Sequence, residues 1–192
     1  KNQLQFSRIA SSTNERTLIS TIFPRNVFVA NSAAVVYSSE GEKNRGKIPN
    51  TLSPDVMAYL CGLLNSFVVD YVVRQKVSAN LNFFYIYQLP VPRSPENAIR
   101  EQIVNRVVKL ISTTTEYELF AKSFSYNIGP LSFQDRKNLV AEINAYVAVL
   151  YGLDKNELSH ILSTFPLVAD GEKKLVLEKF IELESIKTQT RS

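Results

Sequence analysis

The stretch GLLNSFVVDYVVRQKVSANLNFFYIYQLPVP, residues 62–92, decides most of what can be expected of this fold. Its first part is apolar at helical spacing, which predicts one long, mostly buried helix that begins after Ser53 and ends near Lys76. Its second part alternates aromatic and aliphatic residues, which predicts a strand over residues 81–89 that stops at a Pro-x-Pro sequence. A basic and polar turn joins the two elements.

The predicted strand would place Phe83, Tyr85 and Tyr87 on one face of a sheet and Phe84 and Ile86 on the other. Tyrosine rings can stack on nucleic-acid bases. Strand alternation nevertheless favours the simpler interpretation that Tyr85 and Tyr87 are core or sheet-face residues.

The N-terminal region is expected to contribute short strands. Residues 17–23, 26–29 and 33–37 carry β-branched and aromatic side chains between breaks at a proline and at polar residues. Residues 38–50 form a polar loop that contains glycine and proline. Together with the apolar helix, these strands predict a short sheet around a buried helix.

After residue 93 the pattern becomes helical. Helices are expected over residues 94–111, 116–122, 132–150, 154–162 and 172–186. Ser132 is an expected N-cap, and Asp154 with Glu157 has the spacing of a capping box. Gly152 suits the C-terminal cap of the helix before it.

The predicted fold class is therefore α+β, with a mixed region over residues 1–93 and an all-helical region over residues 94–192. The chain of 192 residues is 45% apolar and 21% charged, which allows a buried core and excludes disorder throughout. It starts at Lys1, and little sequence precedes Arg8. We therefore expect the first region to lack its N-terminal part.

The net charge and the cysteine content limit the kind of partner and the cellular compartment that can be expected. A net charge of +4 and an isoelectric point near 9.1 fit an anionic partner without requiring one. Cys61 is the only cysteine, so internal disulfides and cysteine-based zinc sites are excluded and a reducing cytoplasm is the expected compartment. No apolar run reaches the roughly 18 residues of a membrane span, so no membrane partner is expected.

Motifs for catalysis are missing. The sequence has neither a glycine-rich turn for S-adenosylmethionine nor an Asn-Pro or Asp-Pro loop to hold a flipped adenine, so we expect no enzyme activity of this chain. A metal-dependent nuclease needs acidic residues and a lysine, and the nearest set is Asp154, Glu172 and Lys174. Asp154 is better explained as a helix cap. His160, the only histidine, is better explained as a surface residue of a helix than as a general base.

Side chains that could bind DNA fall into three clusters. These are Arg8, Asn14 and Arg16; Lys43, Arg45 and Lys47; and Arg74, Lys76, Asn80 and Asn82. Lysine and arginine bind phosphates, whereas asparagine and arginine can each make two hydrogen bonds to a base edge. Each cluster also has a purely structural interpretation, as a turn into a strand, an ordinary surface hairpin, or turn and helix-cap chemistry.

Three segments together resemble one family. They are RIASSTNERTLISTIFP (residues 8–24), LLNSFVVDYVVRQKVSANLNFFYIYQLPVP (residues 63–92) and LVAEINAYVAVLYGLDKNELSHILSTFPLV (residues 139–168). In this order they are similar to the end of the TaqI-like target-recognition domain and the helical tail of adenine-specific DNA methyltransferases. The relatives belong to type IIG-like restriction–modification systems and to BREX- and DISARM-type phage defence.

The resemblance implies a bacterial parent enzyme that binds S-adenosylmethionine and methylates adenine N6, and some relatives also cleave DNA. It implies that this chain recognises double-stranded DNA and contacts the methyltransferase catalytic domain of the same polypeptide. The alternative is a scaffold that docks onto that domain without binding DNA tightly. Recognition is favoured if Arg8, Arg16, Arg45, Arg74 and Lys76 share one concave face, and docking is favoured if they scatter.

Overall fold

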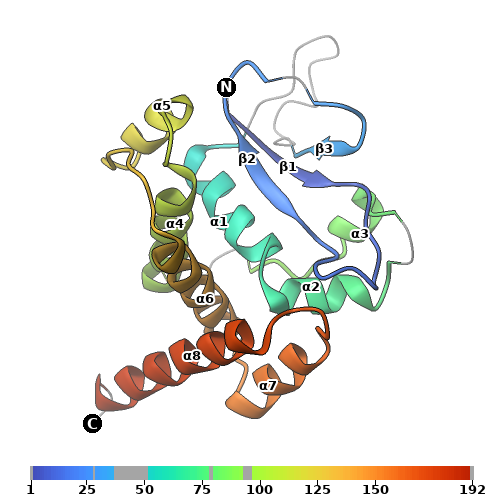
Figure 1. The fold of residues 1–192 in the computed structure, drawn as a ribbon, viewed down its shortest axis with the longest axis vertical. Coiled ribbons are helices and arrows are strands. Elements are labelled where there is room, and N and C mark those ends of the chain that lie inside the picture. Colours follow the sequence, from blue (N-terminus) through green and yellow to red (C-terminus); the bar gives the residue numbers. More distant parts are fainter. Residues whose placement is uncertain (1, 28, 37–51, 78–79, 93–96, 191–192) are drawn as a thin grey trace.

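The fold is α+β, as the sequence predicts: a small antiparallel sheet lies against a group of helices (Figure 1). The structure is a computed structural model, and it describes residues 2–27, 29–36, 52–77, 80–92 and 97–190. The apolar helix α1 (Pro54–Leu64) packs directly on two strands of the sheet.

The sheet has three strands in the order β2-β1-β3. They are β1 (Gln3–Ser7), β2 (Ser20–Phe23) and β3 (Ala33–Val35). Both outer strands run antiparallel to β1, with Leu4 opposite Ile22 and Phe6 opposite Ala34. Leu4, Ile22 and Phe6 are buried, so the face that they share belongs to the core.

Two of the three strands predicted individually are confirmed. β2 lies within residues 17–23, and β3 lies within residues 33–37. The strand predicted over residues 26–29 is wrong for the residues that are described, because Asn26 has a φ of 62° and forms a turn. Asparagine tolerates this left-handed backbone better than most residues, so a local turn replaces the extended chain.

The single long helix predicted over residues 53–76 is wrong, because it is two helices, α1 and α2 (Phe67–Arg74), bent by 62°. The break falls at Asn65 and Ser66. Ser66 Oγ accepts a backbone N–H of the next turn at 3.2 Å and so begins α2, while Asn65 bonds to the sheet. Among the described residues, none of the helices alone has both the length and the apolarity of a membrane span.

The strand predicted over residues 81–89 is wrong. The chain there forms the short helix α3 (Phe83–Ile86), and its β contact among the described residues is one isolated bridge between Ile9 and Asn80. Asn82 caps α3 by accepting a backbone N–H at 3.0 Å. The cap therefore prevails over the strand preference of the aromatic residues that follow.

The second half is helical, as predicted. Its elements are α4 (Asn97–Ile111), η2 (Thr115–Tyr117), α5 (Glu118–Lys122), α6 (Phe133–Leu150), α7 (Lys155–Ser163) and α8 (Asp170–Thr190). The expected N-caps at Ser53, Ser132 and Asp154 are confirmed, and Asp154 and Glu157 form the full capping box. Gly152 follows α6 with a φ of 71°, which favours glycine.

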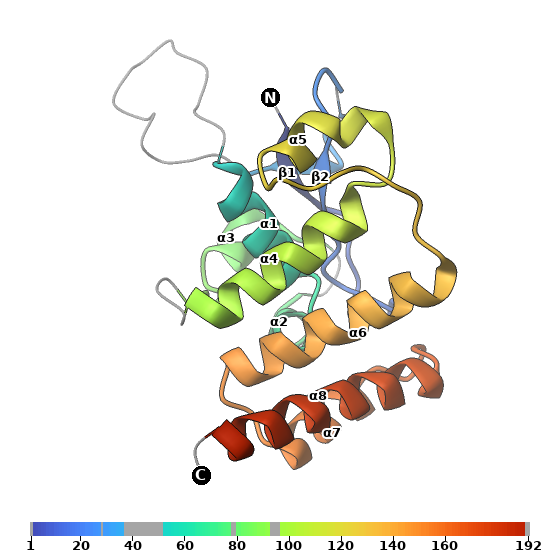
Figure 2. The same cartoon turned by 90° about the vertical axis from the view of Figure 1, so that its left-hand side faces the viewer.

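The helices connect the two halves of the chain. α1 packs on α4, α4 packs on α6, and α6 lies along α8 (Figure 2). At Gly62 of α1 an added Cβ would lie 2.6 Å from Ile103 Cγ2 and 3.1 Å from Val107 Cγ2 of α4, so only glycine fits without movement. Buried residues from Leu4 to Phe180 form one hydrophobic cluster, to which both halves contribute.

Candidate nucleic-acid interface

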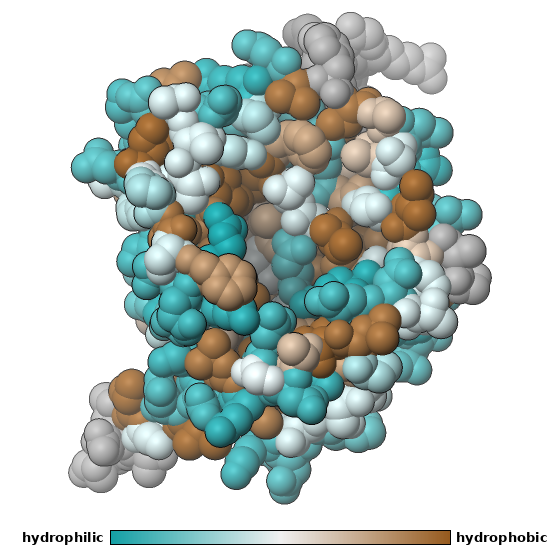
Figure 3. Space-filling view, in the orientation of Figure 1, coloured by the Kyte–Doolittle hydropathy of each residue, from teal (hydrophilic) through white to brown (hydrophobic). Residues whose placement is uncertain are grey.

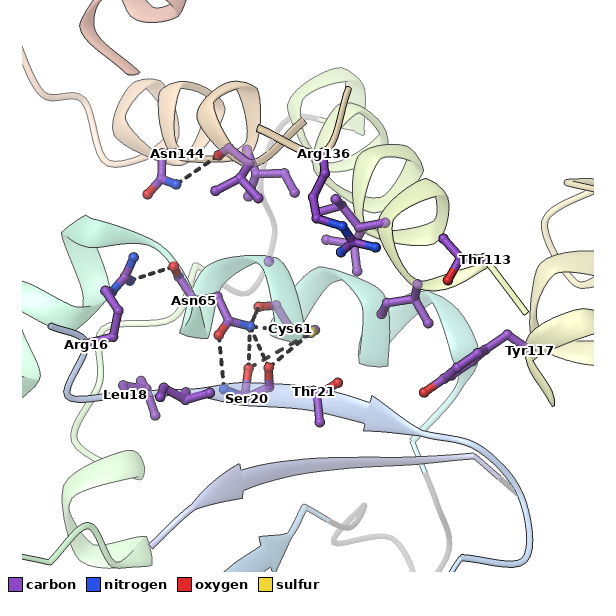
Figure 4. Close-up of a pocket in the computed structure, with 17 residues that line it drawn as sticks. Arg16, Leu18, Ser20, Thr21, Cys61, Asn65, Thr113, Tyr117, Arg136 and Asn144 are labelled. Carbon is purple, nitrogen blue, oxygen red and sulfur yellow. Dashed lines mark hydrogen bonds between the residues drawn. The ribbon is translucent and has the colours of Figure 1, made fainter. Parts of the chain in front are cut away.

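β2 is an edge strand of the described sheet, and side chains cover its outer edge. Asn65 Oδ1 accepts the Ser20 N–H at 3.0 Å, and Asn65 Nδ2 donates to the Ser20 carbonyl at 2.9 Å (Figure 4). The Tyr117 hydroxyl donates to the Ile22 carbonyl at 2.9 Å. These bonds satisfy backbone groups that a further strand would use, so β2 is protected from pairing with another chain.

Asp70 of α2 is fully buried and is the centre of a charged cluster. Its carboxylate accepts the backbone N–H groups of Thr17 and Leu18, each at 3.1 Å at the closest oxygen, and the Nε–H of Arg16 at 2.8 Å. Arg74 Nε lies 3.9 Å from the other carboxylate oxygen. We call Arg16, Asp70 and Arg74 the Asp70 cluster. Two cations and two backbone donors offset the cost of burying this charge.

The two arginines of the Asp70 cluster also bind the backbone. Arg16 Nη2 donates to the Asn65 carbonyl at 2.6 Å. Arg74 Nη2 donates to the carbonyls of Asn14 and Glu15, the latter at 2.6 Å. The loop between β1 and β2 is thereby tied to both ends of α2.

Both guanidinium groups lie over aromatic rings. Arg16 Cζ is 4.3 Å from the centre of the Phe67 ring, and Arg74 Cζ is 4.2 Å from the centre of the Phe165 ring. Burial lowers the pKa of Arg74, the nearby Asp70 raises it, and the like charge of Arg16 lowers it further. The Asp70 cluster therefore joins the loop before β2, helix α2 and the turn after α7.

A second group of polar residues gathers where the chain leaves β1, beside α3 and the end of α2 (Figure 1). The Leu81 N–H donates to the Arg8 carbonyl at 2.8 Å, and Ile9 forms the bridge to Asn80. The Arg8 guanidinium is exposed and donates to Asn31 Oδ1 at 2.7 Å. These backbone bonds hold the polar turn before α3 against the end of the sheet.

Exposed apolar and basic side chains surround that turn. Lys76 is exposed, and its Nζ lies 3.3 Å from Gln88 Oε1. Tyr87 is 80% exposed, Ile9 69% and Phe84 67%, although residues of this size are more often buried. We call this set the β1-end surface: Arg8, Ile9, Lys76, Asn80, Asn82, Phe84 and Tyr87.

The residues predicted to contact DNA divide into three groups. The β1-end surface holds Arg8, Lys76, Asn80 and Asn82. The Asp70 cluster and the loop bound to it hold Asn14, Arg16 and Arg74. Lys43, Arg45 and Lys47 lie outside the described residues. The described cations therefore do not share one exposed face, since two of them turn inward to a carboxylate. By the criterion stated from the sequence, this scatter favours docking, and only Arg8 and Lys76 remain as exposed cations for DNA among the predicted residues that are described.

Sequence reasoning missed the residues that organise this region. Asp70 is a single carboxylate in an apolar stretch, four residues before Arg74, and a buried acid at that spacing requires a cationic partner. Asn65 gave no signal beyond its place in the helix pattern. The placement of Tyr87 in the core or on a sheet face is wrong, because α3 replaces the strand and exposes the ring. Tyr85 does pack against the core.

The residues considered for a nuclease have other partners. Asp154 caps α7, and Lys174 Nζ lies 3.8 Å from Glu178. Glu172 faces a lysine of α6 at 3.9 Å. His160 is exposed, with its ring against Tyr71. In the part of the chain that the structure describes, no group of three or more His, Cys, Asp or Glu side chains could hold a metal ion.

Comparisons with family models, with curated proteins and with solved structures find no match to this chain. The resemblance to adenine methyltransferases therefore stays a prediction from the three sequence segments. The structure brings residues from all three segments into contact at the Asp70 cluster: Arg16 from the first, Asp70 and Arg74 from the second, and Phe165 from the third.

Proposed function

We propose that residues 2–92 bind double-stranded DNA as the target-recognition part of an adenine-specific DNA methyltransferase. The observation that carries the proposal is the gathering of cations, amides and exposed aromatic rings on the β1-end surface. Affinity for duplex DNA comes from cations at phosphates, and specificity comes from polar groups at base edges. The β1-end surface offers both kinds of group on segments that the Ile9–Asn80 bridge and the Leu81–Arg8 hydrogen bond hold together.

The fold gives this surface the rigidity that recognition needs. Arg8 is the first residue after β1, and Asn80 forms the bridge to Ile9. The sheet therefore fixes the backbone of both residues. Lys76 comes two residues after α2, whose orientation is set by the Asp70 cluster. Polar side chains on a supported backbone lose less conformational freedom on binding than side chains on a free loop.

The contact between the three resembling segments supports the same proposal. The three segments are far apart in the sequence but meet at one buried charge. Because each needs the others to offset that charge, we expect related proteins to carry all three. The parent would transfer a methyl group from S-adenosylmethionine to adenine N6, using a catalytic domain outside this chain. Such a parent acts on bacterial DNA, so its compartment would be the cytoplasm.

The test is binding of the 192-residue chain to duplex DNA over a range of salt concentrations, measured by fluorescence anisotropy. The variant is Arg8→Gln with Lys76→Gln, and the matched control is Lys109→Gln, an exposed lysine near the end of α4. We expect the double variant to reduce the slope of log affinity against log salt by about 2, which corresponds to two phosphate contacts. The control should leave the slope unchanged.

Two outcomes would oppose the proposal. If the double variant and the control have equal slopes, DNA does not contact the β1-end surface. If the folded chain shows no affinity for DNA at low salt, the titration is repeated with the full-length parent. Binding by the parent would mean that recognition also needs the catalytic domain, and no binding by the parent would mean that this region does not recognise DNA.

A second candidate function is docking onto the catalytic domain as a scaffold. One observation favours it: Arg16 and Arg74, two of the residues predicted to contact DNA, are bound within the chain to Asp70. Exposed apolar side chains on the helical half, such as Phe133 and Leu167, also suit a protein contact. If docking is the role, the full-length parent should bind DNA equally well with and without the Arg8 and Lys76 substitutions.

A further inference from the structure

A cavity of about 580 Å³ lies between β2, α1, α4 and α6. The space-filling view shows a central hollow on the face of the molecule seen in Figure 1, bordered by both hydrophobic and hydrophilic residues (Figure 3). Its volume is within the range of about 300–1,000 Å³ that is typical of sites for small organic ligands. It is separate from the β1-end surface, since the two share no residue.

Most of the cavity wall is apolar. Ile19 and Leu18 come from the sheet side, Val107 from α4, and Val140 and Ile143 from α6. Cys61 and Gly62 of α1 form part of the floor, where the missing Cβ of glycine brings α1 and α4 close together. A wall of this kind favours an apolar ligand body, because its surface is removed from water on binding.

The charged residues in the wall are both cationic. They are Arg16 and Arg136, and none of the lining residues is acidic. Arg16 is paired with Asp70, but Arg136 makes no ion pair with any described carboxylate. Figure 4 shows the Arg136 side chain extending from α6 toward the cavity. An unpaired guanidinium beside an apolar cavity is suited to a carboxylate, sulfonate or phosphate.

We propose that this cavity binds a small amphipathic organic anion, with its acidic group at Arg136 and its apolar body between β2 and α6. Hydroxyl groups of Thr21 and Thr113 are also in the wall and can hydrogen-bond polar atoms of such a ligand. The Tyr117 hydroxyl is already committed to the Ile22 carbonyl, so it shapes the wall and donates no further bond.

A neighbouring hollow of about 280 Å³ indicates where the acidic group belongs. It shares Arg16, Arg136 and Val140 with the larger cavity but is also lined by Glu15 and Glu172. Lys137 also lines that hollow and pairs with Glu172 at 3.9 Å, so the carboxylate that disfavours an anion on that side is Glu15, which has no ion pair with a described cation. Arg136 stands between the two spaces, so an anion bound to it is favoured on the side of the larger cavity.

The experiment uses two fluorescent probes with the 192-residue chain. Anilinonaphthalene sulfonate is an amphipathic anion, and phenylnaphthylamine has the same apolar body without the charge. We expect saturable, one-site binding of the anionic probe. Arg136→Gln should weaken the anionic probe about tenfold, or roughly 1.4 kcal/mol for one charge-assisted hydrogen bond, and leave the neutral probe unchanged. Lys109→Gln removes the same charge elsewhere and should change neither probe.

The proposal is overturned if the anionic probe does not saturate. It is also overturned if Arg136→Gln has no effect, or if that variant and the Lys109 control weaken binding equally. The position is tested with Val140→Trp, which fills the cavity from α6 and should abolish binding of both probes. If that variant does not fold, Ile19→Trp fills the cavity from the residue before β2, and undiminished binding to the folded variant would place the probe elsewhere.

Discussion

The Asp70 cluster and the β1-end surface contain the same kinds of residue, but the cationic side chains bind within the chain in the first and face water in the second. Both draw on the loop after β1 and on the chain around α2, and both contain arginine and polar side chains that the sequence marks as DNA contacts. In the cluster, the guanidinium groups of Arg16 and Arg74 bind a buried carboxylate, carbonyls and aromatic rings. On the surface, Arg8 and Lys76 keep their charges in water.

The difference depends on one residue. Asp70 faces the interior and needs cations, so the arginines within reach serve the fold. No described carboxylate pairs with Arg8 or Lys76, so their charges are available to a partner. Residue type and sequence position alone do not distinguish an arginine that supports the fold from one that binds a ligand.

The largest expected effect is that of Asp70→Asn. The change keeps the shape of the side chain but leaves two partly buried arginines without a counter-charge, so we expect a loss of about 3–5 kcal/mol in the free energy of unfolding. Urea denaturation followed by circular dichroism measures it. The control is Asp55→Asn, which removes an exposed carboxylate paired with Arg100 and should cost less than about 1 kcal/mol. Equal losses would mean that burial does not separate the two kinds of ion pair.

Asn65→Ala should have an intermediate effect. It removes the bonds to the Ser20 N–H and carbonyl and leaves both groups unpaired at a buried edge, at a cost of about 1–3 kcal/mol. Asn138→Ala is the control, because the Asn138 side chain accepts an exposed hydrogen bond from Gln134, one turn earlier on α6, at 3.1 Å. Hydrogen exchange of the β2 amides should increase in the first variant and stay unchanged in the control.

The free energy of unfolding should depend on pH through the Cys61 thiol, which lies beside Ser20 and Asn65 at the edge of β2. Burial raises the pKa of the Cys61 thiol from 9.0 to about 11, although hydrogen bonds from Ser20 and Asn65 lower it in part. The unfolded chain releases this proton above pH 9, and the folded chain retains it, so stability falls as pH rises. We expect a loss of about 1.3 kcal/mol between pH 8 and pH 10 that Cys61→Ala lacks. If both proteins lose the same amount, the thiol is not held neutral by burial.

Local signals in the sequence predict where several helices begin and end, in both halves of the chain. Ser53, Ser132 and Asp154 each cap the helix that follows, and Gly152 takes the left-handed conformation expected of it. A cap is a contact between residues three or four positions apart, so it depends little on the rest of the fold. Helix periodicity is equally local, which explains why α6 and α7 were predicted almost to the residue.

Tertiary contacts explain why the sequence predictions of one long helix and of a strand over residues 81–89 are wrong. Asn65 ends α1 because the backbone of β2, 45 residues earlier, offers hydrogen bonds to its side chain. The aromatic run after Asn82 alternates like a strand but pairs with none of the described strands, and a cap and a helical turn satisfy its backbone instead. The candidate site was predicted with the same kind of success and error. The sequence identified its polar residues but not that the Asp70 carboxylate binds two of them, Arg16 and Arg74.

The smallest expected effect on stability is that of Tyr87→Ala on the β1-end surface. The ring is 80% exposed and its contact is with Phe83, so its loss should change the free energy of unfolding by only about 0.5 kcal/mol. An exposed ring that stacks on a base or packs in a groove contributes about 1–3 kcal/mol to binding, so DNA affinity should fall at least fivefold. Phe133→Ala is the control: it removes a ring on α6 that is 74% exposed and lies under Lys137, so it should change stability by a similarly small amount and leave DNA affinity unchanged. If Tyr87→Ala destabilises the chain as much as Asn65→Ala does, the ring belongs to the fold. The division between a region that supports the structure and a region that binds a partner then no longer holds at α3.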